Sequence, residues 1–201
     1  MSAEQENTSP RFALRAATAR AHERLDQLYS RFDLGLAEDY GAFLLAHAPA
    51  FIAAERALET AGADALIPGW LARRRGAALL RDIADMGLVA PRPLLAPAFT
   101  SDAQILGGLY VLEGSRLGGA VLVRQVKSGL PTAFLTPGNP ADWRAFISVL
   151  ELRLRLDEVL AEAVWAAQAV FTLFERSART QLESSGIARS ERPGRSDQLR
   201  P

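Results

Sequence analysis

The chain has 201 residues, 23 Lys and Arg against 23 Asp and Glu, a hydrophobic content of 49% and no cysteine. This length and composition predict one domain with its own hydrophobic core. Without cysteine the chain has no disulfide framework, thiolate metal site or cysteine nucleophile, and its two histidines cannot form a zinc cluster alone. A formal net charge of zero argues against nucleic-acid binding driven by bulk charge.

The sequence shows no targeting or membrane segment, so we expect a cytoplasmic protein. Residues 1–10 are polar and acidic, unlike the basic and then apolar start of a signal peptide. The most apolar segment, residues 105–123, has Glu113 and Arg116 near its middle, where charges are most costly in a membrane. We therefore predict a buried helix for this segment.

Helical periodicity begins close to the N-terminus. Ser9 followed by Pro10 is typical of a helix start, and apolar residues then recur at spacings of three and four to about Tyr29. A second helix is predicted from about Glu38 until Gly62, which is a common residue at a helix end.

Two more helices are predicted in the middle of the chain. Residues 68–86 fit a third helix, and the proline-rich residues 91–97 can only form a loop. Thr100 or Ser101 would cap a fourth helix, which would extend to about Ser128.

The last helical region opens at Asn139 and Pro140 and is too long to be unbroken, so we predict a junction near residues 152–156. From Glu183 the chain is polar and rich in arginine, which is typical of disorder. The fold class is therefore all-α, with a flexible N-terminus (1–9), one domain (10–182) and a disordered tail (183–201).

The first group of candidate functional residues lies on the first helix. Arg15, His22 and Asp26 are spaced by seven and four residues, which places them on nearly one face. A carboxylate one turn from an imidazole can fix the tautomer of a metal-ligating histidine. The alternative is a surface histidine in a local ion pair. His47 has apolar neighbours and is expected in the core or at a helix interface.

The second group consists of glycines within an apolar helix, where each costs about 1 kcal/mol relative to alanine. Gly107, Gly114 and Gly118 are spaced to form one stripe. A stripe without side chains admits a flat ligand, and it equally permits close contact with another helix through Gly114 and Gly118.

These two groups lie in motifs that resemble the bacterial heme oxygenases. Residues 14–26 read LRAATARAHERLD, similar to the proximal helix of that family, and residues 110–119 read YVLEGSRLGG, similar to its distal helix. The resemblance covers roughly residues 10–180 and is strongest to the proteobacterial branch associated with bacteriophytochromes. It implies a single-domain helical bundle, with heme between the first helix and a kinked, glycine-rich distal helix.

The resemblance also implies roles for individual residues. His22 would be the axial iron ligand, Asp26 the acidic residue that holds its imidazole, and Arg15 a partner of a heme propionate. Ser115 stands where many members have an aspartate that organises distal water. The residues expected at the distal side of the heme are Tyr110, Gly114, Ser115, Gly118 and Gly119, of which Gly114, Ser115 and Gly118 would act on bound dioxygen.

The implied activity is oxidative cleavage of heme b, at once cofactor and substrate, to biliverdin, carbon monoxide and ferrous iron. Electrons would come from a separate ferredoxin or flavin reductase, because the sequence has no flavin, nicotinamide or iron–sulfur motif. Biliverdin would be supplied to a bacteriophytochrome. Two alternatives remain from the residues alone: a heme carrier without catalysis, and a ligand-free helical scaffold.

Overall fold

The computed structural model describes residues 9–186, and this part of the chain contains helices and no strand, which confirms the all-α prediction. The α-helices are α2 (Pro10–Tyr29), α3 (Ala37–Thr60), α4 (Ala63–Leu66), α5 (Gly76–Asp85), α6 (Asp102–Leu122), α7 (Pro140–Arg153) and α8 (Asp157–Ser184). Three short 3-10 helices are η1 (Trp70–Arg73), η2 (Val123–Gln125) and η3 (Ala133–Leu135).

The first two predicted helices are confirmed. α2 begins at Pro10 after the N-cap Ser9 and ends at Tyr29. α3 ends two residues before Gly62, whose φ of +92° lies in the left-handed region that favours glycine.

The third predicted helix is wrong as a continuous element. The chain forms η1 and breaks at Arg74, and a new helix, α5, begins at Gly76. The cause is a buried carboxylate on α3: Glu55 accepts hydrogen bonds from the backbone N–H groups of Arg75 at 2.7 Å and Gly76 at 2.9 Å. These two hydrogen bonds fix the start of α5. They also explain the glycine at position 76, because a Cβ there would lie 2.4 Å from Glu55 Oε2 and the carboxylate would have to move.

The fourth predicted helix begins as expected but ends early. The hydroxyl of Ser101 accepts a hydrogen bond from the Gln104 N–H, which caps α6. The α-helix ends at Leu122 instead of about Ser128 and tightens into η2. Lys127 then donates its N–H to the carbonyl of Leu34 at 3.2 Å, so the chain has already turned toward another segment.

The predicted junction in the last helical region is confirmed, between the end of α7 at Arg153 and the start of α8 at Asp157. Helix α8 continues to Ser184, two residues beyond the last residue of the expected domain. The rest of the predicted tail, residues 187–201, and residues 1–8 lie outside the described part of the chain.

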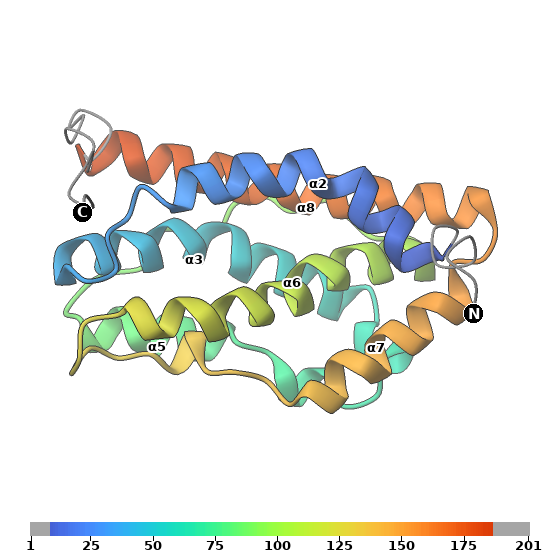
Figure 1. The fold of residues 1–201 in the computed structure, drawn as a ribbon, viewed down its shortest axis with the longest axis horizontal. Helices are drawn as coiled ribbons and strands as arrows, with labels where there is room; N and C mark the ends of the chain where they lie inside the picture. Colours follow the sequence, from blue (N-terminus) through green and yellow to red (C-terminus); the bar gives the residue numbers. More distant parts are fainter. Residues whose placement is uncertain (1–8, 187–201) are drawn as a thin grey trace, which may run out of the picture.

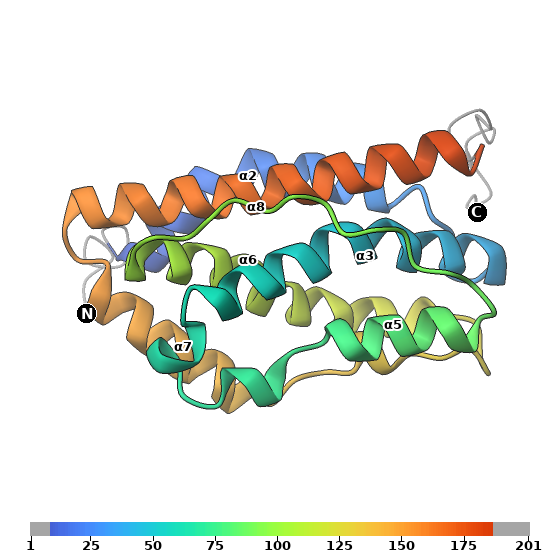
Figure 2. The same ribbon diagram turned by 180° about the vertical axis from the view of Figure 1, so that it is seen from behind.

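Helix α8 is the element on which the bundle is assembled. It packs along α2, α3 and α6, while α5 and η3 cover the other side of α3 (Figures 1 and 2). α7 crosses the end of the bundle next to the start of α2, where Glu151 accepts a hydrogen bond from the Ser9 hydroxyl at 2.9 Å. Both helices that carry the sequence motifs, α2 and α6, are thus held by one long helix.

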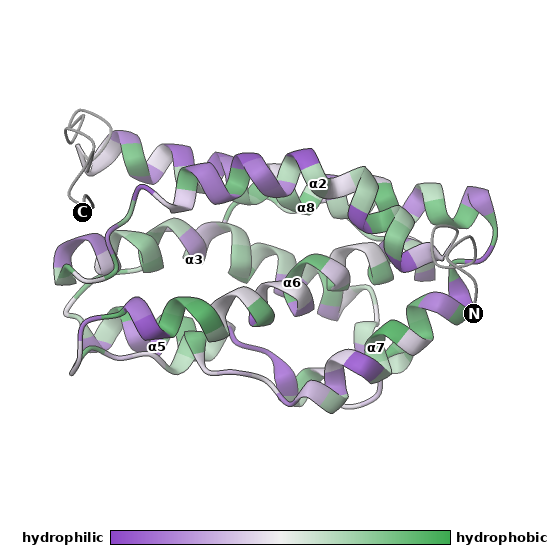
Figure 3. Ribbon diagram, in the orientation of Figure 1, coloured by the Kyte–Doolittle hydropathy of each residue, from purple (hydrophilic) through white to green (hydrophobic). Residues whose placement is uncertain are grey.

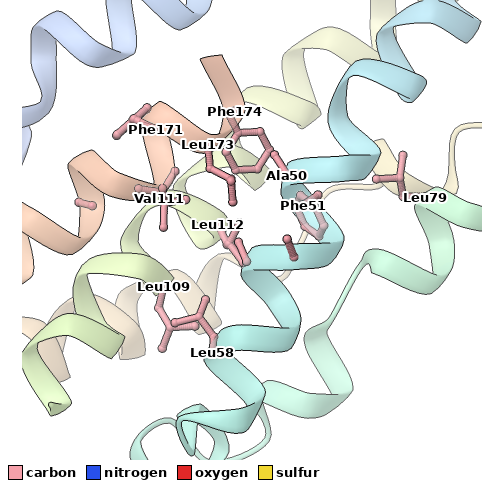
Figure 4. Close-up of a cluster of buried hydrophobic side chains, with 14 of the residues drawn as sticks. Ala50, Phe51, Leu58, Leu79, Leu109, Val111, Leu112, Phe171, Leu173 and Phe174 are labelled. Atoms are coloured by element: carbon pink, nitrogen blue, oxygen red, sulfur yellow. The ribbon is translucent and has the colours of Figure 1, made fainter. Parts of the chain in front are cut away.

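The core lies between α3, α6 and α8. Figure 4 shows Phe51 and Leu58 of α3, Leu112 of α6, and Phe174 of α8 converging in it. Burial of each such side chain contributes about 1.5–3 kcal/mol. By contrast α2 buries few residues and is largely hydrophilic along its length (Figure 3), so it is a peripheral helix.

The segment Asp102–Gln125 is long and apolar enough to span a membrane, by length and composition. Half of its apolar window is buried inside the fold, as is typical of a core helix, and Glu113 within it is also buried. The predicted buried helix is therefore present.

Gly107 allows α6 and α8 to approach each other closely. A Cβ at this position would lie 2.0 Å from the carbonyl oxygen of Ala163 on α8. A backbone atom cannot yield as a flexible side chain can, so the helices could not keep this distance with any larger residue.

His47 lies on α3 among aromatic rings, as its apolar neighbours predicted. Its ring centroid is 4.2 Å from that of Tyr29 and 4.3 Å from that of Phe43. Nδ1 lies 2.9 Å from the Phe43 carbonyl, which can only accept, so Nδ1 carries the proton in the neutral ring. Burial lowers the pKa of His47 from 6.5 to about 4.

We predict that Gly107→Ala destabilises the ligand-free protein by about 1–3 kcal/mol or more, the usual cost of overpacking. The control is Gly118→Ala on the same helix, where nothing lies within 4 Å of the added methyl group. That variant should gain up to about 1 kcal/mol from helix propensity. Urea unfolding of both variants measures the difference, and equal stabilities would contradict the close approach at Gly107.

We also predict a pH dependence that originates at His47. Between pH 4 and 6.5 the unfolded ring binds a proton that the folded ring does not, so stability rises with pH in this window and falls as the solution is acidified. His47→Phe should remove about one proton from this dependence, about 1.4 kcal/mol per pH unit at its steepest. Urea unfolding at several pH values compares the slopes, and parallel profiles for the two proteins would show that His47 titrates normally.

Candidate functional site

His22 is presented on the exposed side of α2 with its ring oriented by Asp26. Nδ1 lies 2.8 Å from Asp26 Oδ2, and the His22 side chain is 63% exposed. Because Nδ1 is bound by the carboxylate, Nε2 is the nitrogen available to a ligand. An exposed pair of this kind contributes at most about 1 kcal/mol to stability, so its effect on the fold is small.

The aromatic neighbour of His22 belongs to α8. The His22 ring lies 6.0 Å from the Phe171 ring, in an edge-on arrangement. The structure thus places His22 beside α8, the helix that also packs along α6.

The middle of α6 has an open apolar face. A Cβ at Gly114 or Gly118 would meet no atom within 4 Å. Leu117 and Val121 share this face, at spacings of three and seven from Gly114, and are 51% and 61% exposed. We call these four residues the open face of α6.

This geometry divides the glycine stripe into two parts. Close helix contact through Gly114 and Gly118, one of the two interpretations of the sequence, is wrong, because both face open space. Gly107 does serve helix packing, as shown above. Gly119 is buried and faces Leu135 of η3 at 3.6 Å, so it lies away from the open face. The glycines do not interrupt the helix, which is continuous from Asp102 to Leu122.

Tyr110 faces α2 one turn before the open face. Burial raises the pKa of the Tyr110 phenol, and Thr18 of α2 and the positive charges of Arg15 and Arg11 act in the opposite direction. The charge of Arg15 thus reaches Tyr110, and Thr18 and Arg11 are further neighbours that the sequence did not indicate.

Ser115 is exposed next to the open face and is held from behind by Arg75. Arg75 Nη2 donates to Ser115 Oγ at 2.5 Å and to the Leu112 carbonyl at 2.8 Å. The Ser115 hydroxyl donates its own proton to that same carbonyl at 2.7 Å. One lone pair of Oγ remains, so Ser115 can accept a hydrogen bond from a water molecule on the open side.

Arg75 is a buried cation that sequence reasoning missed. It is 6% exposed, and its guanidinium lies 4.9 Å from the ring centre of Phe51 and 5.2 Å from that of Phe134. Burial and the nearby Arg116 lower the pKa of Arg75 to about 9, so it remains charged at neutral pH. It stands in a run of three arginines, and nothing in the sequence distinguishes the buried one.

The arrangement favours a metal that is already held by a planar ligand. No group of three or more His, Asp or Glu residues in the described part of the chain could hold a bare metal ion. A single oriented imidazole on α2 and an apolar face of α6 with two uncovered glycines instead suit a flat metal complex such as a porphyrin.

Comparisons with known proteins identify relatives of this chain. No family model matches the chain. A heme oxygenase of Xanthomonas campestris pv. campestris (strain 8004) is 41% identical over 113 residues, which cover 53% of this chain and 68% of that protein.

The fold is similar to that of the NO- and CO-bound heme oxygenase from Neisseria meningitidis, with a TM-score of 0.73. The alignment covers 96% of this chain and 99% of that one at 24% identity, so it supports the fold alone. The Xanthomonas protein is 41% identical to this chain, and the alignment covers more than two thirds of the Xanthomonas protein. This chain therefore belongs to the heme oxygenase family.

Proposed function

We propose that this chain binds heme between α2 and α6 and cleaves it to biliverdin, carbon monoxide and ferrous iron, with dioxygen and electrons from a separate protein. The observation that carries this proposal is the open face of α6, where a Cβ at Gly114 or Gly118 would meet no atom of the described residues within 4 Å. Helix α8 supports both α6 and α2, and α2 presents the exposed and oriented His22. Membership of the heme oxygenase family supports the proposal independently.

On the proximal side, His22 would bind the iron through Nε2. Asp26 holds Nδ1, which keeps the ring in the tautomer and orientation that a metal ligand needs. A neutral imidazole donates less electron density to iron than a thiolate does, which disfavours early cleavage of dioxygen.

Positively charged residues would bind the propionate edge. Arg15 lies two helical turns from His22, about 10.5 Å along the axis at about 1.5 Å per residue, similar to the distance from a heme iron to its propionates. Arg11 and Tyr110 lie at the same end of the site, where the positive charge of Arg11 acts on the Tyr110 phenol. These residues would fix the rotation of the heme about the His22 axis.

On the distal side, Gly114 and Gly118 would let the heme approach the α6 backbone. Heme supplies the iron that binds dioxygen and the porphyrin that is oxidised. The glycines leave space beside α6. Oxygen held in this space would be directed toward one meso carbon, and we expect the alpha position from the commonest behaviour of the family. Ser115, held by Arg75, would orient a water molecule beside the oxygen in place of the aspartate of other members.

Several finer assignments rest on the sequence resemblance. We propose heme b as the form bound, a bacteriophytochrome as the recipient of biliverdin, and a cytoplasmic location. An acidic ferredoxin or a flavin reductase would suit the exposed arginines of α2, because opposite charges steer association. We place the domain at residues 10–184, since α8 extends to Ser184.

The first test is the proximal ligand. We expect His22→Ala to fold, because the side chain is exposed, but to lose the histidine-ligated Soret spectrum on addition of hemin and all turnover with reductant. Asp26→Ala should still bind hemin with a shifted spectrum and reduced turnover, and Glu23→Ala on the same helix is the control. An unchanged hemin spectrum in His22→Ala would refute the assignment of the ligand.

Turnover of the wild type separates an enzyme from a carrier. A hemin spectrum that converts to that of biliverdin under aerobic conditions with reductant identifies the enzyme. A stable hemin spectrum under the same conditions identifies a carrier, and the absence of a Soret band identifies a ligand-free scaffold.

The second test addresses the distal face. Gly114→Ala and Gly118→Ala should leave the heme-free protein as stable or more stable, by up to about 1 kcal/mol, because the methyl group meets open space. In the hemin complex the same methyl group would crowd bound dioxygen, so turnover should fall or the biliverdin isomers should change. Thermal unfolding and product analysis are the measurements, and normal turnover with unchanged isomers in both variants would rule out contact with the oxygen.

A further inference from the structure

A small cavity lies between residues 67–73 and α7, and its lining residues do not belong to α2 or α6. Figure 2 shows α7 at the end of the bundle where this cavity lies. Its volume is about 290 Å³, and its walls include Ile67, Ala145, Phe146 and Val149 together with two charged residues, Arg73 and Asp142. Within residues 9–186 neither of these two charged side chains has a hydrogen-bond partner, so the walls offer an unsatisfied cation and an unsatisfied anion beside apolar surface.

Arg73 is a mostly buried cation with unused donors. Its side chain is 15% exposed, and its buried Nε has no hydrogen-bond partner among the residues that the structure describes. Its ion pair is with Glu113, 3.8 Å from Nη1, and Arg116 approaches the same carboxylate at 3.4 Å. Two guanidiniums thus share one carboxylate, which leaves a positive charge and donors that require a further acceptor.

Asp142 contributes the opposite charge from the first turn of α7. It is partly buried in the cavity wall, and its carboxylate makes no ion pair or hydrogen bond within residues 9–186. It does not pair with Arg73, although both line the same cavity. A ligand that satisfies both groups must therefore carry an acceptor and a cationic donor that are separated from each other.

We propose that this cavity binds a small ω-amino acid, with its carboxylate on Arg73, its protonated amine on Asp142 and its methylene chain on the apolar walls. Arginine is the preferred residue for a carboxylate, and the attraction is strengthened when the groups are desolvated. At about 30 Å³ per water the cavity holds on the order of ten water molecules. This is the lower end of the range for ligand sites and limits the ligand to a few carbon atoms.

The charges also discriminate against simpler ligands. A monocarboxylate would leave Asp142 unpaired, and inorganic phosphate would be repelled by it. An alkylamine would leave Arg73 unpaired. Each single-charge ligand therefore loses one of the two charge-assisted contacts and should bind more weakly.

The experiment uses the heme-free full chain, so that its outcome is independent of the proposed oxygenase activity. Calorimetric titration and thermal unfolding are carried out with 4-aminobutyrate, and with butyrate and butylamine as analogues of the same length that lack one charge. We expect 4-aminobutyrate to bind and to raise Tm, with each analogue at least tenfold weaker. Arg73→Gln and Asp142→Asn should each weaken binding of 4-aminobutyrate at least tenfold, while the exposed controls Arg92→Gln and Asp85→Asn should not.

A second variant keeps the test valid if Arg73→Gln does not fold. Ala145→Phe adds bulk to the cavity wall and leaves both charged residues in place, and it should abolish binding. The proposal is overturned if the wild type shows no binding of 4-aminobutyrate, if butyrate binds equally well, or if Ala145→Phe binds as the wild type does. Equal binding of butyrate would identify an anion site, and no binding at all would mean that water fills the cavity.

Discussion

The close contact between α6 and α8 at Gly107 is the constraint on which the site depends. Because the α8 backbone approaches Gly107 so closely, α6 is fixed with one side against α8. The side that carries Leu117 and Val121 is left without a covering helix. α2 rests on the same α8, so one helix determines where both the histidine and the open face lie. A substrate between α2 and α6 would thus be positioned by a helix that contributes mainly core residues.

Behind the open face, the structure holds an unusual number of buried charges. Glu55 fixes the start of α5, and Arg75, which comes immediately before that start, extends to Ser115. Burial raises the pKa of Glu55 and lowers that of Arg75, so desolvation opposes both charges. Such groups rarely improve stability over well-packed apolar residues. Their benefit is geometric, because they fix one hydroxyl beside the proposed oxygen-binding side.

The sequence was sufficient for the elements whose signals are local. Ser9 with Pro10 and Asn139 with Pro140 marked two helix starts correctly, since capping depends on adjacent residues. The break before α5 could not be predicted, because its cause is Glu55, some twenty residues away in the chain. The same limit applies to Arg75. Its run of three arginines has no internal pattern, and only tertiary packing decides that the third is buried while the second remains at the surface.

The glycines show why the candidate site was only partly predictable. Gly107, Gly114 and Gly118 have equivalent positions in the periodic pattern, yet one meets a backbone carbonyl and two meet open space. Spacing along a helix gives the direction of a position, whereas the neighbour that occupies that direction comes from another part of the chain. Spacing alone could not separate Gly107 from Gly114 and Gly118. The family resemblance did so, because the similar segment, YVLEGSRLGG, contains Gly114 and Gly118 and begins after Gly107.

Helix α2 is attached to the bundle on one side and leaves its other side to a ligand. It buries Leu14, Thr18 and Ala21, and Leu25, Leu28 and Tyr29 also pack against the core, while the candidate iron ligand His22 lies exposed. A ligand that binds His22, Arg15 and the open face of α6 would join α2 to α6 across the site. The free energy of unfolding would rise with the logarithm of the ratio of ligand concentration to Kd. The position of α2 would then depend in part on bound substrate.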